Sequence, residues 1–409
     1  MRLFAITVEA LSPLAFPARK PGAQFRASMP YVPGGAIYGA LGQRLQPQQP
    51  DQLALFRAIR CHNAYPAWEG DGWSRPLPRT AERPRGDDAA PPIDTLVERV
   101  CWEQLRPPAL IFSPGDAHGR AWEADAGFHA PAPPAERDLR RQTRRKVQQR
   151  ALTRVGISRR RGTAEDGQLY SPLVLSEVTT RRVYRWGDQP AERELAVRSD
   201  SPSRFMGSLA APDDYDPAAD LRAIGHIGGR TTTGLGQVRL QASPLPAERG
   251  EDVRARVAEL TRLFRTRAAI YRALGGAGWQ LAESAALFTV DLLSDAILLE
   301  QGWRPTMVLT AEMLREAAGL TSRVELLRAF AGYGYTGGWH VTWDAPKPSA
   351  VCTLMGGVFV FQAPDGLTAD EYERLADLQL DGLGERRPEG YGQARVCDEF
   401  HVQAAFGVG

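Results

Sequence analysis

The chain has 409 residues, of which 43% are hydrophobic and 24% are charged, and its formal net charge is +2. This balance excludes an intrinsically disordered chain and a simple polycation, so any nucleic acid would have to be bound by local clusters of charge. At roughly 100–200 residues per domain, the length predicts two or three domains.

The first 45 residues predict a strand and then a helix. Residues 3–11 are apolar enough for a core strand, and this short run, followed by Pro13 and Pro17, is typical of a first strand rather than a signal peptide. Gly34 and Gly35 open a helix over residues 36–45, where backbone N–H groups at the helix N-terminus are able to hold a phosphate. A tight strand-to-helix turn needs the same two glycines, so both interpretations stay open.

Residues 47–134 are rich in Pro, Gly, Asp and Arg, and we expect irregular structure there. A loop of this length inside a compact domain is usually functional or ordered by a partner. We therefore interpret it as an insertion into the first domain, in contact with either RNA or protein.

Residues 137–161 form the most basic window of the chain. Five arginines recur there at helical spacing, so a helix would display them as one stripe. Such a stripe is often only a solvated face, but almost no acidic residue balances this one, and we favour contact with RNA. The stripe consists of Arg137, Arg140, Arg141, Arg144 and Arg145, and Arg159, Arg160 and Arg161 form a second cluster at the end of a strand.

The rest of the chain predicts two similar runs of strands and helices. In the first run we expect paired strands at residues 169–179 and 183–186, a further segment beginning at 201–209, a helix at 213–224 and a closing strand at 237–241. An amphipathic helix at 249–274 follows. The second run has strands at 285–300, 324–342, 350–362 and 393–402, and helices at 310–318 and 368–380, the latter opened by a Thr368–Glu371 capping box.

Each run contains a glycine-rich loop with the same skeleton. The first is GHIGGRTTTGLGQVRL at 225–240 and the second is DGLGERRPEGYGQARV at 381–396. Glycines permit positive φ and close approach of another backbone, and arginine supplies a fork that suits phosphate and stacks on bases. We interpret the two loops as one phosphodiester-binding device used twice. The alternative is a pair of turns whose glycines serve only backbone geometry.

The sequence contains no metal or cofactor motif. Its four cysteines are far apart and form no CxxC pair, and HExxH, GxSxG and GxxxxGK[ST] are absent. We therefore expect no metal site, no cofactor and reduced cysteines. Of the six histidines, only His226 in the first glycine loop has a position suited to a general base, and it is a weak candidate.

Several of these segments resemble the RAMP superfamily of CRISPR-associated RNA-binding proteins. The two loops GHIGGRTTTGLGQV and GERRPEGYGQARV are similar to its glycine-rich loop, and FRASMPYVPGGAIYGALGQRL at 25–45 is similar to its entry into the first helix. Residues 153–177 resemble its central strand pair, and HNAYP at 62–66 with PLP at 76–78 resembles a segment of type III members.

The resemblance implies an α+β fold of two tandem ferredoxin-like (RRM-like, β-α-β-β-α-β) domains. The N-terminal domain would span residues 1–245, with an insertion at about 47–134, and the C-terminal domain residues 279–409. Residues 246–278 would form a linker helix between them. The internal repeat would then be architectural.

The resemblance also implies a function: a non-catalytic, cytoplasmic subunit of a type III CRISPR effector complex in antiviral defence. The chain is similar to the two-domain, family-five-like subunit of type III-D complexes, which holds the 5′ repeat-derived handle of the guide RNA. Implied partners are the guide RNA, the large polymerase-like subunit and the backbone RAMP subunits, with target RNA met only indirectly and no membrane. The alternatives are a guide-RNA-processing endoribonuclease and a protein-docking scaffold.

We expect the RNA-binding residues to be the glycines and basic or polar side chains of these segments. They are Arg19, Lys20, Gly34, Gly35, Arg140, Arg141, Arg144, Arg145, Arg159, Arg160, His226, Gly228, Gly229, Arg230, Thr231, Gly234, Gly236, Arg386, Arg387, Gly390, Tyr391 and Gly392.

Overall fold

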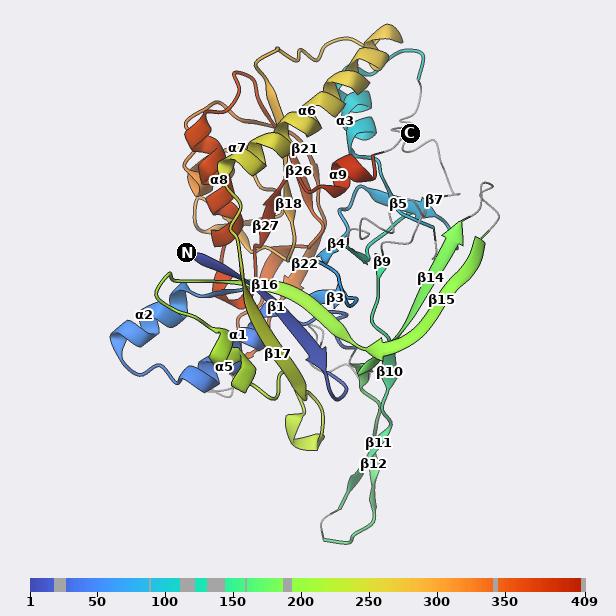
Figure 1. Ribbon diagram of the computed structural model, residues 1–409, viewed down its shortest axis with the longest axis vertical. Helices are drawn as coiled ribbons and strands as arrows, with labels where there is room; N and C mark the ends of the chain where they lie inside the picture. The colour runs from blue at the N-terminus through green and yellow to red at the C-terminus, as the bar shows by residue number, and fades with distance from the viewer. Residues whose placement is uncertain are drawn as a thin grey trace.

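The structure is a computed structural model that describes residues 1–17, 27–87, 90–110, 122–130, 144–158, 160–186, 193–340 and 345–405. Two antiparallel sheets organise it. Figure 1 shows the first sheet with α1 and α5 in the lower half of the molecule and the second sheet with α6 and α8 in the upper half. The fold is therefore mixed α and β, as expected from the sequence.

The first sheet has the order β17-β1-β16-β2, and β3 also pairs with β16. The strands are β1 (Arg2–Ala10), β2 (Arg60–Cys61), β3 (Tyr65–Ala67), β16 (Arg204–Ala211) and β17 (Val238–Leu245). β1 lies antiparallel between β16 and β17 along most of its length. The first strand of the sequence is thus the centre of its sheet.

Side chains of β1 alternate in burial, which shows that one face of this sheet forms a core. Phe4, Ile6 and Val8 are fully buried against α1 (Gly34–Leu45) and α5 (Ala218–Ala223). The opposite face of β1 is only half-buried. Alternation with period two is what a sheet covered by helices on one side produces.

The second sheet has the order β21-β26-β18-β27. Its strands are β18 (Ala286–Leu292), β21 (Glu325–Phe330), β26 (Val358–Ala363) and β27 (Ala394–Val396), and its helices are α6 (Gly250–Ala273), α7 (Ala311–Ala318) and α8 (Ala369–Asp381). Every residue of β18 and β26 is buried, so both faces of this sheet are covered. The predicted helices α6, α7 and α8 are confirmed, as is the Thr368–Glu371 capping box.

The segment 47–134 is less irregular than the sequence indicated. It contains α2 (Pro50–Ala58) and α3 (Leu96–Leu105) as well as short strands. α3 packs on α6 of the second half, where Leu96, Val100 and Leu105 join the larger core. An insertion between elements of the first sheet therefore completes the core of the second.

A basic helix over residues 137–161 was the wrong prediction for the part that the structure describes. There the chain forms β9 (Arg144–Arg145), β10 (Gln149–Ala151) and β11 (Arg154–Ile157). β9 pairs with β8 (Phe128–His129) and β10 with β13 (Leu173–Leu175). Partners distant in sequence thus override the local helical spacing of the arginines.

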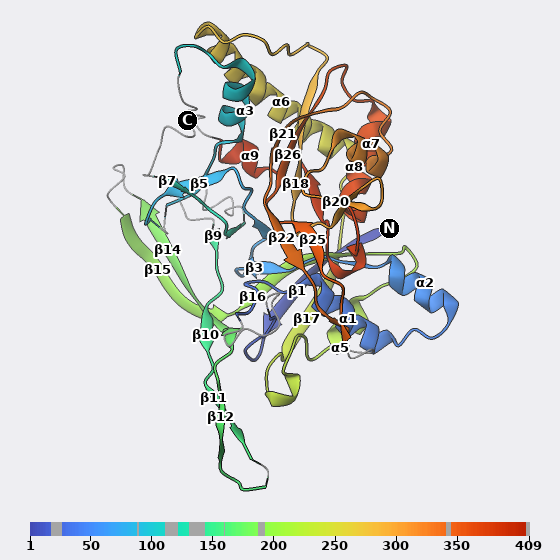
Figure 2. The same ribbon diagram turned by 180° about the vertical axis from the view of Figure 1, so that it is seen from behind.

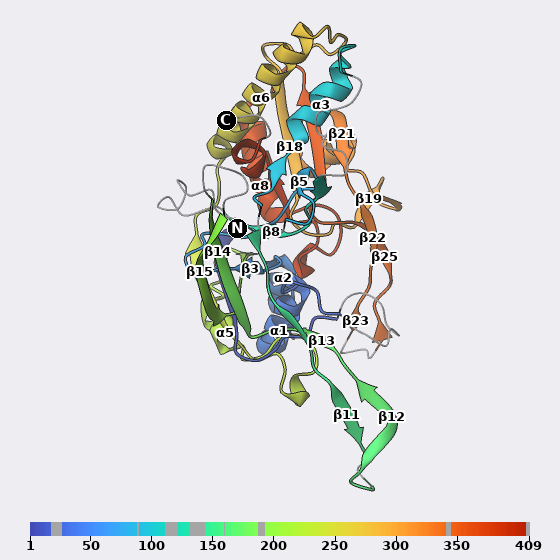
Figure 3. The same ribbon diagram turned by 90° about the vertical axis from the view of Figure 1, so that its right-hand side faces the viewer.

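Two hairpins leave the body of the molecule. β11 pairs with β12 (Ala164–Tyr170), and this arm projects far from both sheets in Figures 1 and 3. β14 (Val178–Trp186) and β15 (Arg193–Pro202) form a long curved ribbon in place of the shorter strands expected there.

The remaining elements are short, and no helix in the described part of the chain combines the length and apolar character needed to cross a membrane. They are β4 (Arg75–Pro76), β5 (Ala81–Pro84), β6 (Ile93–Asp94), β7 (Trp122–Ala124), β19 (Leu298–Glu300), β20 (Arg304–Thr306), β22 (Tyr333–Thr336), β23 (Trp339–His340), β24 (Ala345–Pro346), β25 (Ala350–Thr353), α9 (Phe400–Gln403) and the 3-10 turns η3 (Thr231–Thr233) and η4 (Arg387–Glu389).

Candidate nucleic-acid interface

The two glycine-rich loops adopt the same backbone conformation. We call residues 228–236 glycine loop 1 and residues 384–392 glycine loop 2. Arg230 and Arg386 are both left-handed, with φ of 62° and 56°, and each precedes a 3-10 turn. Each turn ends at a left-handed glycine, Gly234 with φ 83° or Gly390 with φ 88°. The prediction of one structural device used twice is confirmed at the level of the backbone.

The last glycine of each loop is required by a close approach within the loop. A Cβ atom at Gly236 would stand 2.4 Å from the carbonyl oxygen of Ile227, and one at Gly392 would stand 1.7 Å from that of Leu383. In return, Ile227 N–H donates to Gly236 O at 2.9 Å, and Leu383 N–H donates to Gly392 O at 2.7 Å. A side chain at either glycine would open the loop.

Both loops are anchored to the segment that follows the first strand of their own sheet. Gly236 N–H donates to Pro13 O at 2.9 Å, and Gly392 N–H donates to Asp295 O at 2.8 Å. The residues after these glycines repeat the pattern, because Gln237 N–H donates to Ser12 Oγ and Gln393 N–H to Ser294 Oγ. These glycine N–H groups are therefore occupied within the chain, and the glycines give the loop its shape rather than an open nest of N–H donors.

Glycine loop 1 is exposed and basic. His226, Gly228, Arg230 and Thr231 are all solvent-exposed, while Leu235 beneath them is buried. The Arg230 guanidinium lies 4.8 Å from the centre of the Tyr170 ring, a favourable cation–π contact. Among the described residues, no carboxylate forms an ion pair with Arg230. The Tyr170 ring thus positions the Arg230 guanidinium, and its positive charge is available to bind an anion.

The projecting arm is attached to glycine loop 1. Tyr170 is the last residue of β12, and Arg154, the first residue of β11, donates from Nη1 to Thr233 O at 3.0 Å. At the far end of the arm, Arg160 is exposed. Arg154 and Tyr170 were not among the predicted site residues, because nothing in the sequence places the base of this hairpin against a loop some 60 residues further on.

Glycine loop 2 carries the same arginine in a different electrostatic setting. Arg386 donates from Nη2 to Glu389 Oε2 at 2.8 Å, and Lys347 Nζ lies 2.6 Å from the same oxygen. Burial raises the pKa of Glu389, but hydrogen bonds from Arg386 and Lys347 lower it by more, below its ordinary value. The carboxylate is therefore ionised, and it neutralises Lys347 as well as Arg386, which the sequence had assigned to RNA.

Glycine loop 2 is also packed against the first half. A Cβ atom at Gly390 would stand 2.7 Å from Cys61 O and 3.1 Å from the Cα of Gly34. Gly34 is buried, and its N–H donates to Asn63 Oδ1 at 2.8 Å. The N-terminus of α1, one of the predicted phosphate sites, thus faces glycine loop 2. Tyr391 lies 5.0 Å from the Arg386 guanidinium, and its hydroxyl bonds to Thr336.

The predicted basic residues outside the arginines discussed above are in three different situations. Arg19, Lys20, Arg140, Arg141 and Arg159 lie outside the described residues, as does the side chain of Arg144. Arg145 is only 2% exposed and forms a bidentate ion pair with Asp71, Nη2 to Oδ1 and Nε to Oδ2 both at 2.7 Å. Arg387 is half-buried and has no ion pair within the described residues.

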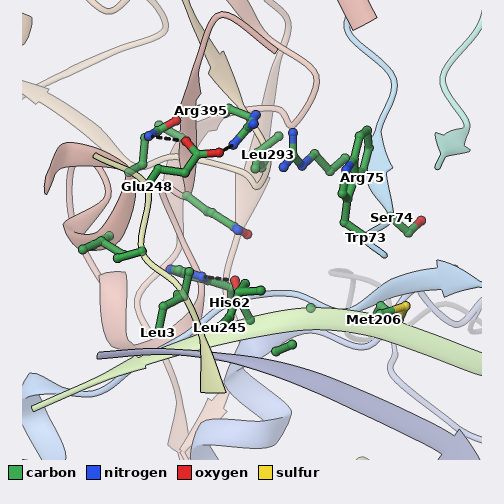
Figure 4. Close-up of a pocket in the computed structure, with 18 of the residues that line it drawn as sticks. Leu3, His62, Trp73, Ser74, Arg75, Met206, Leu245, Glu248, Leu293 and Arg395 are labelled. Atoms are coloured by element: carbon green, nitrogen blue, oxygen red, sulfur yellow. Dashed lines mark hydrogen bonds and ion pairs between the residues drawn. The ribbon is translucent and has the colours of Figure 1, made fainter. Parts of the chain in front are cut away.

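A cleft of about 580 Å³ lies between the two halves (Figure 4). Glu248 accepts from Arg395 and Arg256 there, each at 2.8 Å. Burial raises the pKa of Glu248, but these arginines lower it to about 2. His62 shares a hydrogen bond with Ser208 Oγ at 2.8 Å, and its burial lowers its pKa to about 4. Arg75, the third arginine that lines the cleft, pairs with Asp398 and Glu399. All three guanidinium charges in the cleft are therefore balanced by carboxylates of the chain itself.

The described residues contain no cluster of three or more His, Cys, Asp or Glu side chains that would hold a metal. His226 forms only a backbone bridge with Gln237, and within the described chain no side chain is hydrogen-bonded to its imidazole. A general base is normally oriented by such a partner. Another histidine, His401, is fully buried between two aspartates and has no access to a substrate.

No protein-family model matches the sequence, and no curated protein matches it. Among solved structures, the chain is similar to a chain of the type III-B Cmr-beta complex bound to cognate target RNA and AMPPnP. The TM-score is 0.42 at 11% identity, covering 87% of this chain and 86% of that one. A second Cmr-beta structure, bound to cognate target RNA, gives 0.40 at 12% identity over the same shares of the two chains. A chain of a type IV-B CRISPR complex gives 0.24 at 15% identity, covering 59% of this chain and 90% of that one. We base no inference on likenesses of this strength.

Proposed function

We propose that this chain is a non-catalytic RNA-binding subunit of a type III CRISPR effector complex. It holds the 5′ repeat-derived handle of the guide RNA and contacts the large subunit and the backbone subunits, in the cytoplasm. The proposal starts from the resemblance of its glycine loops and its first helix to RAMP proteins.

On this proposal each half of the chain is a ferredoxin-like domain, at residues 1–245 and 279–409. The two sheet orders support it. The first sheet, β17-β1-β16-β2, and the second sheet read from its other end, β27-β18-β26-β21, both place the strands in the order fourth, first, third and second. In each half a helix follows the first strand and another follows the third, as a split β-α-β unit requires.

The proposal of RNA binding rests on the exposure and the contacts of the Arg230 guanidinium. It is exposed, stacked on Tyr170, free of ion pairs in the described chain and carried by a loop whose backbone is anchored by internal hydrogen bonds. A pre-positioned guanidinium binds phosphate with little loss of side-chain freedom. Arg154 and Thr231 lie beside it as further donors.

Glycine loop 2 has a different role in this proposal. Its arginine is neutralised by Glu389 and its glycine packs on Gly34, so it joins the two domains rather than holding a nucleotide backbone. In this proposal RNA contacts glycine loop 1 only. Glycine loop 2, which the sequence suggested as an equivalent RNA site, instead connects the two domains.

Binding of a labelled handle RNA to the Arg230→Ala variant tests the proposal. Affinity should fall about tenfold or more at low salt, since a charge-assisted hydrogen bond is lost. The slope of log affinity against log salt should become shallower by about one unit, because one phosphate contact disappears. Arg315→Ala, at an exposed arginine of α7, is the matched control and should change neither quantity.

Two outcomes would overturn the proposal. Unchanged affinity and slope in Arg230→Ala, with loss of assembly into a complex, would identify a scaffold. A metal-independent cleavage product from repeat RNA that disappears in His226→Ala would identify a processing endoribonuclease.

A further inference from the structure

A groove of about 420 Å³ lies between the C-terminal ends of α7 and α8 and the β19–β20 hairpin. Its floor is apolar, with Leu298 and Leu378 buried and Leu299 and Met313 half-buried. Figure 2 shows α7, α8 and β20 on one side of the upper half of the molecule, away from the yellow-green turn of glycine loop 1. The groove is therefore separate from the proposed RNA site.

Four exposed carboxylates stand on three walls of this groove, and none of them forms an ion pair within the described residues. They are Glu316 of α7, Asp377 and Asp381 of α8, and Glu385 of glycine loop 2. We call this site the acidic groove.

The two arginines that line the acidic groove do not balance these carboxylates. Arg374 Nε donates to Asp370 Oδ2 at 2.8 Å, so its charge is already neutralised by a residue outside the groove. Arg387 is half-buried and is the other arginine of the lining. Four carboxylates therefore face one available guanidinium.

Three of the carboxylates lie where their helix disfavours negative charge. Glu316 is in the last turn of α7, and Asp381 ends α8 with Asp377 one turn before it. A helix C-terminus carries partial negative charge, and like charges four residues apart repel each other. No basic residue occupies the last turn of α8. An uncompensated local cost of this kind is typical of a functional surface.

The spacing of the acidic side chains suits separate cations rather than a single ion. The described residues contain no group of three or more His, Cys, Asp or Glu side chains close enough to hold a metal. Lysine and arginine side chains along a peptide would instead reach the carboxylates one by one.

An exposed tryptophan stands at the rim of the acidic groove. Trp303 is 70% exposed and follows Gly302, which lines the groove. Trp303 lies at the tip of the β19–β20 hairpin, where Arg304 Nε donates to Glu300 Oε2 at 2.9 Å and closes the turn. Tryptophan often anchors protein–protein contacts, because its large ring buries much apolar area.

We infer that the acidic groove docks a basic segment of a neighbouring protein subunit, whose Arg or Lys side chains meet the carboxylates while an apolar side chain packs on Trp303. Charge complementarity of this kind selects a partner and fixes its register. The same carboxylates would repel a nucleic acid. The inference goes beyond the proposed function, which rests on RNA binding at glycine loop 1 and assigns no surface to a protein partner.

The test uses the full-length chain and a short labelled peptide built of arginine, leucine and alanine. The double change Asp377→Asn with Asp381→Asn should weaken peptide binding at least about fivefold at low salt, since two ion pairs are lost. The same double variant should unfold at the temperature of wild type or above it, because the removed charges oppose the helix dipole. Trp303→Ala should weaken peptide binding about tenfold.

Two single changes on α7 form a matched pair. Glu312 and Glu316 are both exposed, but only Glu316 lines the acidic groove. Glu316→Gln should weaken peptide binding about twofold, whereas Glu312→Gln should leave it unchanged. A peptide with glutamate in place of arginine should not bind to wild type.

The outcomes separate this inference from the proposed function. If wild type does not bind the arginine peptide, or if the double variant binds it as tightly as wild type does, the inference is wrong, whatever Arg230→Ala does to handle binding. Loss of oligouridine binding in the double variant would identify RNA as the occupant. Self-association of wild type that the double variant lacks would identify a second copy of the chain, and either result would equally overturn the inference.

Discussion

Gly34 and Gly390 lie back to back across the joint between the two halves of the chain, and a Cβ atom added to Gly34 would stand 3.0 Å from the Cα of Gly390. The same Cβ atom would stand 1.9 Å from Cys61 O. Three separate segments therefore meet at a point where only glycine fits. The N-terminus of α1, which the sequence predicted as a phosphate site, lies at a contact between the two halves.

Gly34→Ala should consequently lower the free energy of unfolding by about 1–3 kcal/mol, the usual cost of overpacking. Gly39→Ala is a matched control in the same helix, since its Cβ would meet nothing within 4 Å. That control should be neutral or stabilising, by up to about 1 kcal/mol, because alanine is the better helix former. The measurement is the free energy of unfolding of the two variants in denaturant. Equal values would contradict the close packing of Gly34 against its neighbours.

His401 should make stability depend on pH above neutrality. Its Nδ1 lies 2.7 Å from Asp94 and its Nε2 2.8 Å from Asp291, all three groups being buried. Burial lowers the pKa of His401, but the two aspartates raise it by more, well above 6.5. The folded state therefore binds the proton more tightly than the unfolded state, and the resulting stabilisation is complete below about pH 6.5 and is lost as pH rises through the folded pKa.

The measurement is the difference in unfolding free energy between wild type and His401→Gln, taken from pH 6 to pH 10. The difference should be largest at the acid end and should shrink as the pH rises. A difference that stays constant or grows with pH would contradict a buried imidazolium.

Thr233→Glu should disable glycine loop 1 without removing its arginine. Thr233 occupies the position that Glu389 holds in glycine loop 2, three residues after the left-handed arginine. A carboxylate there should pair with Arg230 as Glu389 pairs with Arg386, and handle RNA should bind about as weakly as it does to Arg230→Ala. Thr233→Gln has the same shape without the charge and should keep most of the affinity in the same assay.

The Arg145–Asp71 pair should behave as a structural ion pair. Both side chains are 3% exposed, so Asp71→Asn puts a neutral amide in place of the carboxylate of a buried bidentate pair and should cost about 3–5 kcal/mol. Replacing both partners, as in Asp71→Leu with Arg145→Met, should cost less than that single change. Thermal unfolding of the three proteins tests this, and a harmless Asp71→Asn would indicate that Arg145 has another anionic partner.

Local sequence was sufficient for the elements whose signals lie within one segment. The capping box of α8 and the apolar spacing of α6 predicted those helices, because caps and periodicity act over a few residues. The repeated glycine spacing predicted a repeated loop for the same reason, since left-handed backbone at Gly234 and Gly390 is a local requirement.

Elements that depend on distant partners were missed. The arginine spacing in residues 137–161 favoured a helix, yet β9 and β10 exist because they pair with residues 128–129 and 173–175. α3 lies in a segment read as irregular, and the apolar face it presents is completed by α6, more than 140 residues away. The strand partners of β9 and β10 and the packing of α3 on α6 could not be predicted from the residues within either segment.

The sequence by itself determined that this chain carries one backbone device twice, because glycine and left-handed arginine specify a loop whatever surrounds it. Only the tertiary structure decided what each copy meets: exposed solvent, Tyr170 and Arg154 for glycine loop 1, and Glu389, Lys347 and the buried end of α1 for glycine loop 2. The physical reason is that backbone conformation is set by neighbours in the chain, whereas the availability of a charge is set by neighbours in space.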